Sequence, residues 1–136
     1  MHTKQDMSRT LRKIESSEAD TLKCIMDYLD LLQAQGKLVY IRHNPSTVIS
    51  KVVRGKIKTA FKKVRPSQLG APDLIVLKGK GSMVGSLWVT DVLLIEAKSP
   101  TGKLSTAQDR WAKLAVAQGM RYVVARDLED VQEALG

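Results

Sequence analysis

The stretch that most constrains the fold, residues 70–98, holds two short apolar runs that are each bordered by a carboxylate. Asp73 directly precedes Leu74–Leu77, and Glu96 directly follows Val92–Ile95. Runs of this length and composition are typical of buried β-strands. If the two runs are neighbouring strands of one sheet, both carboxylates can converge on a single metal ion.

A lysine joins these two acids. Because side chains alternate along a strand, Glu96 and Lys98 should point to one face and Ala97 to the other. A hard divalent cation takes oxygen ligands, so Asp73, Glu96, a strand carbonyl and waters could bind magnesium or manganese. The ion would polarise a phosphate and acidify a water, while Lys98 orients that water or offsets developing charge. This is the arrangement of a metal-dependent phosphodiesterase, although a Glu-x-Lys alone also arises by chance.

Length and charge limit the alternatives. A chain of 136 residues, 43% of them hydrophobic, predicts one domain with a real core. The 22 Lys and Arg against 14 Asp and Glu give a net charge of +8, which favours a polyanionic partner but does not separate nucleic acid from an anionic membrane. No run of 18 apolar residues and no signal-peptide core appear, so we expect a soluble, cytoplasmic protein with no membrane partner.

Cysteine and histidine usage gives no sign of a structural metal or a disulfide framework. Cys24 is the single cysteine and lies in an apolar helical pattern, so we expect it to be a buried small hydrophobe in a reducing compartment. His2 and His43 lie far apart without a partner at ligand spacing, which argues against a zinc site. The Gly79–Gly85 segment has no P-loop spacing, so no nucleotide cofactor is expected.

The chain predicts an α/β sandwich with a mixed sheet, in which residues 16–136 form one domain after a flexible arm at 1–15. A pairing of the strands that contain Asp73 and Glu96 through a flexible loop at 79–85 would bring the two acids together. In chain order, the expected elements are a helix at 17–35, strands at 37–43, 73–78 and 87–98, a helix at 105–119, a strand at 121–126 and a helix at 127–135.

Two further polar residues lie at helix starts and have two explanations each. Glu18 is an acid at the positive end of a helix dipole, but it also lies on the same face as the apolar stripe of Leu22, Ile25, Met26 and Leu29. Gln108 can complete a capping box with Ser105, or it can face a site from the second helix. The sequence alone leaves both alternatives open.

Residues 44–69 form a basic segment in a region, 31–72, that contains no acidic residue. Interleaved apolar residues predict a packed hairpin or a short helix. A charge run is usually a solvated face, but one without any compensating acid favours phosphate contacts that position DNA without reading its sequence. The predicted contacts are Lys51, Arg54, Lys56, Lys58, Lys62, Lys63 and Arg65.

Gly70-Ala-Pro-Asp-Leu74 followed by Glu96-Ala-Lys98 resembles the bipartite signature of the PD-(D/E)xK nuclease superfamily, whose fold has the same helix and strand order. Further elements at the expected places make the chain, over roughly residues 15–126, similar to the VRR-NUC domain: Glu18, Gly102-Lys-Leu, Gln108 with Trp111, and Gly119. The resemblance implies a restriction-endonuclease-like αβββαβ core with a mixed sheet flanked by helices. The basic segment 44–69 has no matching family motif.

Carried over residue by residue, the resemblance implies that Asp73 and Glu96 bind the catalytic metal, magnesium or manganese. The backbone carbonyl of Ala97 would add a ligand, and Lys98 would be the catalytic lysine. The resemblance further implies that Glu18 faces the site from the first helix, through metal-bound water, and that Gln108 supports it from the second.

Stand-alone VRR-NUC proteins of bacteria and viruses resemble Holliday-junction resolvases, which are homodimers that cut branched DNA in repair. The expected function is therefore a metal-dependent deoxyribonuclease acting on four-way junctions inside a bacterial or phage-infected cell. Two other readings remain open. One is a flap-cutting, restriction-type or exonucleolytic enzyme on the same fold, and the other is a non-catalytic nucleic-acid-binding module.

Overall fold

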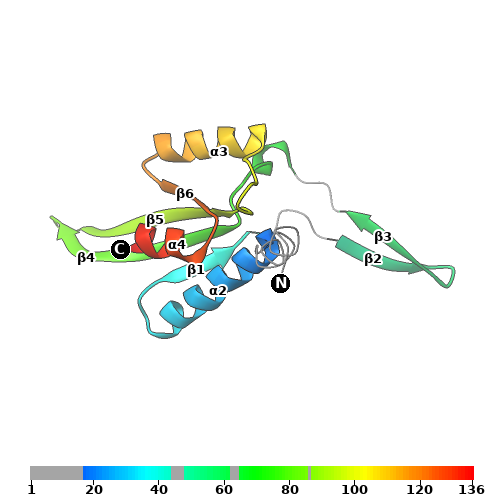
Figure 1. The fold of residues 1–136 in the computed structure, drawn as a ribbon, viewed down its shortest axis with the longest axis horizontal. Coiled ribbons are helices and arrows are strands. Elements are labelled where there is room, and N and C mark those ends of the chain that lie inside the picture. Colours follow the sequence, from blue (N-terminus) through cyan, green and yellow to red (C-terminus); the bar gives the residue numbers. More distant parts are fainter. Residues whose placement is uncertain (1–16, 44–47, 62–64, 86) are drawn as a thin grey trace, which may run out of the picture.

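The computed structural model describes residues 17–43, 48–61, 65–85 and 87–136 (Figure 1). The predicted arm at 1–15 lies outside these ranges. In chain order the elements are α2 (Glu18–Ala34), β1 (Val39–Arg42), β2 (Val48–Val53), β3 (Lys56–Phe61), the 3-10 turn η1 (Pro66–Gln68), β4 (Leu74–Val84), β5 (Leu87–Ala97), α3 (Thr106–Ala117), β6 (Arg121–Ala125) and α4 (Leu128–Leu135).

The main sheet is mixed and has the strand order β1-β4-β5-β6. β1, β4 and β5 are antiparallel neighbours, whereas β6 runs parallel to β5. A parallel connection needs a crossover, and α3 supplies it. The predicted α/β class with a mixed, helix-flanked sheet is confirmed, and the predicted pairing of the two strands that contain the acids is observed.

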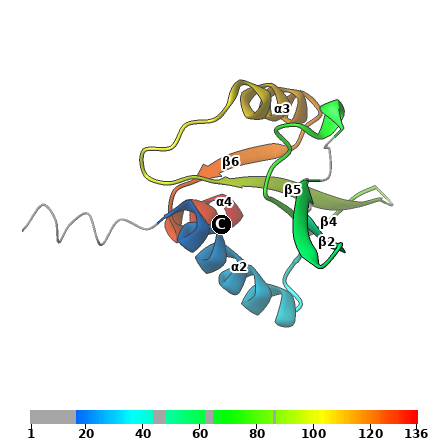
Figure 2. The same cartoon turned by 90° about the vertical axis from the view of Figure 1, so that its right-hand side faces the viewer.

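Helices cover both faces of this sheet (Figure 2), with α2 and α4 on one side and α3 on the other. The main core lies between α2, α4 and the sheet. Alternation along β5 sends Leu93, Ile95 and Ala97 into this core. Glu96 and Leu94 therefore belong to the opposite face, beneath α3.

The first helix forms as its pattern predicts. Ser17 caps α2 in a reciprocal capping box with Asp20. Ile25 and Leu29 are fully buried, and Leu22 and Met26 pack against the core. Cys24 is exposed, so its predicted burial is wrong. It lies one residue from Ile25, about 100° around the helix axis, and therefore on the side away from the buried stripe.

The expected loop at 79–85 is mostly strand. β4 continues to Val84 and β5 starts at Leu87, with Met83 paired to Trp88 and an irregular register between Gly79 and Met83. Glycine weakens a strand but does not end it when the partner strand is already in register. The chain reverses at Gly85, which has a φ of 65°.

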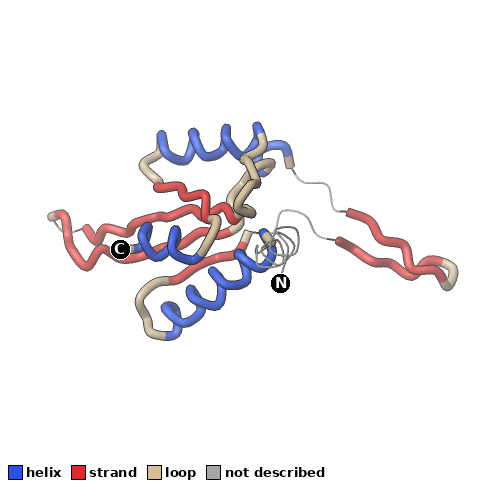
Figure 3. The backbone as a smooth tube through the Cα atoms, in the orientation of Figure 1, coloured by secondary structure: helices blue, strands red, loops and turns tan. Residues whose placement is uncertain are grey.

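The basic segment contains a second, two-stranded sheet, β2–β3, which lies apart from the main sheet (Figure 3). Arg54 and Gly55 form its turn with φ values of 51° and 75°, as a tight hairpin turn requires. Of the two predicted alternatives, the hairpin is therefore correct. The expected packing is not found at Val52 and Ile57, which are each 75% exposed, because no layer of the described residues covers them.

No helix in the described ranges has the length and apolar character needed to span a membrane.

Candidate metal centre

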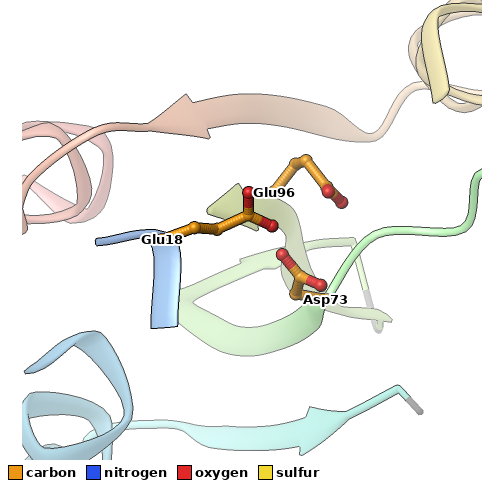
Figure 4. Close-up of side chains that lie close together, drawn as sticks. All are labelled: Glu18, Asp73 and Glu96. Atoms are coloured by element: carbon orange, nitrogen blue, oxygen red, sulfur yellow. The ribbon is translucent and has the colours of Figure 1, made fainter. Parts of the chain in front are cut away.

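Three carboxylates from separate segments meet at one edge of the main sheet (Figure 4). Glu18 is the first residue of α2, Asp73 directly precedes β4, and Glu96 lies near the end of β5. One oxygen from each lies within 4.8 Å of the other two. The structure thus brings together the two acids at the strand ends and the acid at the helix start.

Strand pairing fixes the position of Asp73. Leu74 lies opposite Ile95 in the antiparallel pair of β4 and β5, so Asp73 falls beside the end of β5. Its Oδ2 accepts a hydrogen bond of 2.8 Å from the backbone N–H of Ala97. The N–H of His43, just after β1, donates to the Asp73 carbonyl at 2.8 Å. The end of β5 therefore holds the carboxylate of Asp73, and the residue after β1 holds its backbone.

Gln108 makes both of the contacts that its position allowed. Its Oε1 accepts from the backbone N–H of Ser105 at 2.9 Å, which completes the capping box of α3. Its Nε2 donates to Oε1 of Glu96 at 2.7 Å. A side-chain amide has a separate acceptor and donor, so one residue starts the helix and orients the acid.

Lys98 lies in the same pocket. Its side chain is 11% exposed, and its Nζ is 3.8 Å from Oε1 of Glu96. The loop that follows is held by Arg126, whose guanidinium donates to the carbonyls of Ser99 and Gly102 at 2.7 Å each. Sequence reasoning assigned Arg126 only to the end of a strand. Its basic character gave no sign of which carbonyls it would bind.

The site disfavours its own negative charge. Burial, and then the charge of Asp73, raise the pKa of Glu96 to about 7, against the opposing effect of Lys98. Burial also raises the pKa of Asp73, and the Ala97 N–H offsets part of that shift. Three acids and one nearby lysine leave a surplus of negative charge that a cation would neutralise.

The donor set fits a divalent metal ion. Glu96 is 2% exposed, and its Oε2 has no hydrogen-bond partner within the described residues. A buried carboxylate oxygen without a partner is costly unless something absent from the protein satisfies it. Carboxylate oxygens at this spacing are ligands that hard cations such as Mg²⁺ prefer. Asp73 and Glu96 would hold the ion, and Glu18 would bind it through water.

Tyr122 was missed by sequence reasoning. Its hydroxyl is buried without a hydrogen-bond partner in the described residues. Burial raises its pKa, and the charges of Glu96 and Asp73 raise it further. Tyr122 pairs with Leu94, two residues before Glu96, so strand alternation places it on the face of the acids. That register was the only available signal, and it depends on knowing the strand order.

Four of the basic residues that were predicted to contact DNA lie on the β2–β3 hairpin or in its turn: Lys51, Arg54, Lys56 and Lys58. Arg54, Lys56 and Arg65 are exposed, and Lys51 pairs with Lys58 across the hairpin. Lys62 and Lys63 fall outside the described residues. The hairpin turn points away from the main sheet (Figure 1), so the structure does not bring Arg54 into the carboxylate cluster.

A mixed sheet flanked by helices, with an aspartate at the start of one strand and Glu-x-Lys at the end of its neighbour, defines the restriction-endonuclease-like, PD-(D/E)xK class. The chain belongs to the VRR-NUC family, because the VRR-NUC domain matches residues 6–127. Searches of curated proteins and of solved structures gave no match. Family membership indicates a nuclease of the PD-(D/E)xK type, and hence DNA as its substrate.

Proposed function

We propose that this chain is a metal-dependent endonuclease that hydrolyses phosphodiester bonds in branched DNA, with four-way junctions as its preferred substrate and Mg²⁺ or Mn²⁺ as its metal. The observation that carries the proposal is the convergence of Glu18, Asp73 and Glu96 around an unpartnered, buried Oε2 of Glu96. Lys98 lies beside the same carboxylate. Such a surplus of acids binds a cation more readily than it binds phosphate directly.

A bound divalent cation would supply Lewis acidity toward the scissile phosphate and lower the pKa of an attacking water. The protein's own groups supply positioning. Asp73 and Glu96 would hold the cation and the Ala97 carbonyl would add a ligand, while Gln108 keeps the Glu96 carboxylate in one orientation. The ammonium of Lys98 offsets negative charge that accumulates on the phosphate oxygens as the water attacks.

The overall reaction consumes one water. The water oxygen bonds to phosphorus, the bond from phosphorus to one ester oxygen breaks, and one proton passes to that leaving oxygen. Glu18 lies on the exposed side of the cluster, where it would hold a water bound to the cation. Glu18 and Gln108 are therefore positioning residues, while Asp73, Glu96 and Lys98 act at the reacting atoms.

Substrate binding is assigned to the basic segment. A surface without any acid between residues 31 and 72 supports phosphate contacts that do not depend on sequence. The junction preference and a homodimer with two active sites rest on the family resemblance, and a dyad-related pair of sites suits a four-way junction. The proposed phosphate contacts are Lys51, Arg54, Lys56, Lys58, Lys62, Lys63 and Arg65.

The test is cleavage of a labelled panel comprising a four-way junction, a flap, a linear duplex and a single strand, with Mg²⁺ or Mn²⁺. Asp73→Asn should abolish cleavage. The matched control is Asp27→Asn, the same chemical change on an exposed face of α2. Paired symmetric cuts in the junction, lost only in Asp73→Asn, are expected.

Other results would favour the other readings. Cutting of the linear duplex at defined sites, or only from ends, would replace junction cleavage by restriction-type or exonuclease activity. Binding of the whole panel without cleavage under either metal would leave a nucleic-acid-binding module.

A further inference from the structure

The chain segment that contains the β2–β3 hairpin begins and ends beside the candidate metal centre. The chain leaves the main sheet at His43, whose N–H binds the Asp73 carbonyl. It returns through η1 to Asp73 itself. The two ends of the inserted segment therefore meet at the carboxylate cluster, and the hairpin extends away from the main sheet (Figures 1 and 3).

The hairpin presents an apolar pair near its turn. Val52 and Ile57 are cross-strand partners, so they share one face, and each is 75% exposed. The next pair toward the turn, Val53 and Lys56, belongs to the other face by alternation. An isolated two-stranded hairpin is only marginally stable in water, so an exposed β-branched pair on it indicates a surface that another molecule covers.

The positive charge of the hairpin indicates which kind of molecule would cover the apolar pair. Arg54 in the turn and Lys56 on the other face of the hairpin are both exposed, and no acidic residue occurs anywhere from residue 31 to 72. A second hairpin of the same kind would bring like charges together. DNA instead offers phosphates for the basic residues and, wherever bases are unstacked, apolar surface for Val52 and Ile57.

The dimensions agree with such a contact. Each strand of the hairpin has six residues. At the usual rise per residue this corresponds to about 20 Å. That is about six steps along a duplex. A hairpin of this length can therefore span several base pairs of a duplex between its open end and its turn.

We propose that the β2–β3 hairpin is an arm that recognises branched DNA, in which Val52 and Ile57 pack against bases unstacked at a branch point while Arg54 at the turn and Lys56 on the opposite face contact the phosphates on either side. The arm prefers branched DNA because a continuous duplex must first be unstacked before the pair can insert, whereas a branch point already exposes its bases. This inference rests on the proposed function and narrows its substrate to a duplex that carries an unstacked step near the cleaved bond.

The experiment measures binding, so that it does not depend on cleavage. Full-length Asp73→Asn protein is titrated in EDTA against a four-way junction and a linear duplex of the same sequence, with 2-aminopurine at the branch point. Val52→Ser/Ile57→Ser removes the apolar pair and keeps every charge. Val39→Ser/Ile41→Ser is the matched control, since these residues are 52% and 56% exposed on an edge strand of the main sheet.

The hairpin variant should lose about tenfold in affinity for the junction, which corresponds to about 1.4 kcal/mol, and change little on the linear duplex. Its 2-aminopurine signal should no longer respond to binding, whereas the β1 control should behave like the parent protein. Melting curves of both variants should stay close to that of the parent, because all four substituted side chains are exposed.

Three results would contradict the proposed role of the hairpin: the parent protein binds the junction no better than the duplex, the hairpin variant loses affinity equally for both DNAs, or the hairpin variant keeps its preference for the junction. If sedimentation shows that Val52→Ser/Ile57→Ser turns a dimer into a monomer, the face joins two copies of the chain instead. Cleavage of the panel by wild-type protein decides the nuclease separately. If the wild-type protein cuts DNA with metal and the hairpin variant still prefers the junction, the proposed nuclease activity stands and the proposed role of the hairpin is wrong.

Discussion

The burial of Glu96 that suits metal binding also lowers the stability of the metal-free folded protein. The pKa of Glu96 rises from an ordinary 4.5 to about 7 in the folded protein, mainly through burial. An acid with a raised folded pKa binds its proton more tightly folded than unfolded. The stability it contributes is therefore fully present below about pH 4.5 and is lost as the pH rises to about 7.

Glu96→Gln should consequently stabilise the metal-free protein at pH 8 and change little at pH 4.5. Solvent on the open side of the site screens part of the shift, so we expect a gain on the order of 1–2 kcal/mol at pH 8. Urea unfolding in EDTA at both pH values measures this, with Glu133→Gln on the exposed side of α4 as control. An equal gain at both pH values would refute the electrostatic explanation.

The sequence predicted the acidic residues of the site better than it predicted the residues that hold them in place. Asp73 and Glu96 each border an apolar strand, so their meeting followed from one pairing assumption. Gln108 kept two explanations because a sequence does not show whether a capping residue also reaches a neighbouring strand, and the structure shows that it does both. Arg126 was not predictable, because its partners are backbone carbonyls selected by the path of a loop.

At the scale of elements, one glycine sets the distance between the loop that carries Asp73 and α3. Gly70 has a φ of 82°, and a Cβ there would lie 2.3 Å from the backbone carbonyl of Ala107 and 2.6 Å from the backbone nitrogen of Gln108. Only glycine permits this approach. The first turn of α3, from which Gln108 reaches Glu96, is thus packed directly on the Gly70 backbone.

Gly70→Ala should destabilise the protein and reduce cleavage, because α3 must shift and carry Gln108 away from Glu96. Gly119→Ala is the matched control, since Gly119 has a φ of 86° but nothing within 4 Å of an added Cβ. Gly119→Ala should cost about 1–2 kcal/mol from backbone strain alone. Urea unfolding should show a clearly larger loss for Gly70→Ala; equal losses would mean that the contact with α3 is unimportant.

The predicted strand boundaries were wrong where a glycine was taken as the end of a strand. The 79–85 segment reads as a loop from its glycines, yet the partner strand extends β4 to Val84 because its ladder was already in register. In the basic segment, interleaved apolar residues predicted a hairpin or a short helix, and the structure contains the hairpin. Their expected packing failed at Val52 and Ile57, since local pattern specifies a strand but not whether another layer lies against it.

At the scale of the whole molecule, the three acids come from the start of α2, the turn before β4 and the end of β5. These segments approach one another only in the folded chain. A divalent ion held by them therefore binds the native state and not the unfolded one, and it must stabilise the fold by mass action.

Mg²⁺ should accordingly raise the unfolding temperature of the wild-type protein without any DNA present. At a concentration of 100 times Kd the gain is about 2.7 kcal/mol. For a domain of this size that corresponds to roughly 5–10 °C. Asp73→Asn should remove the shift, whereas Asp27→Asn, which loses only an exposed ion pair, should keep it. Thermal unfolding at constant ionic strength measures the effect. Mg²⁺ also screens charge generally on a basic protein. An equal rise in the unfolding temperature of all three proteins would therefore show that the carboxylates do not bind the ion.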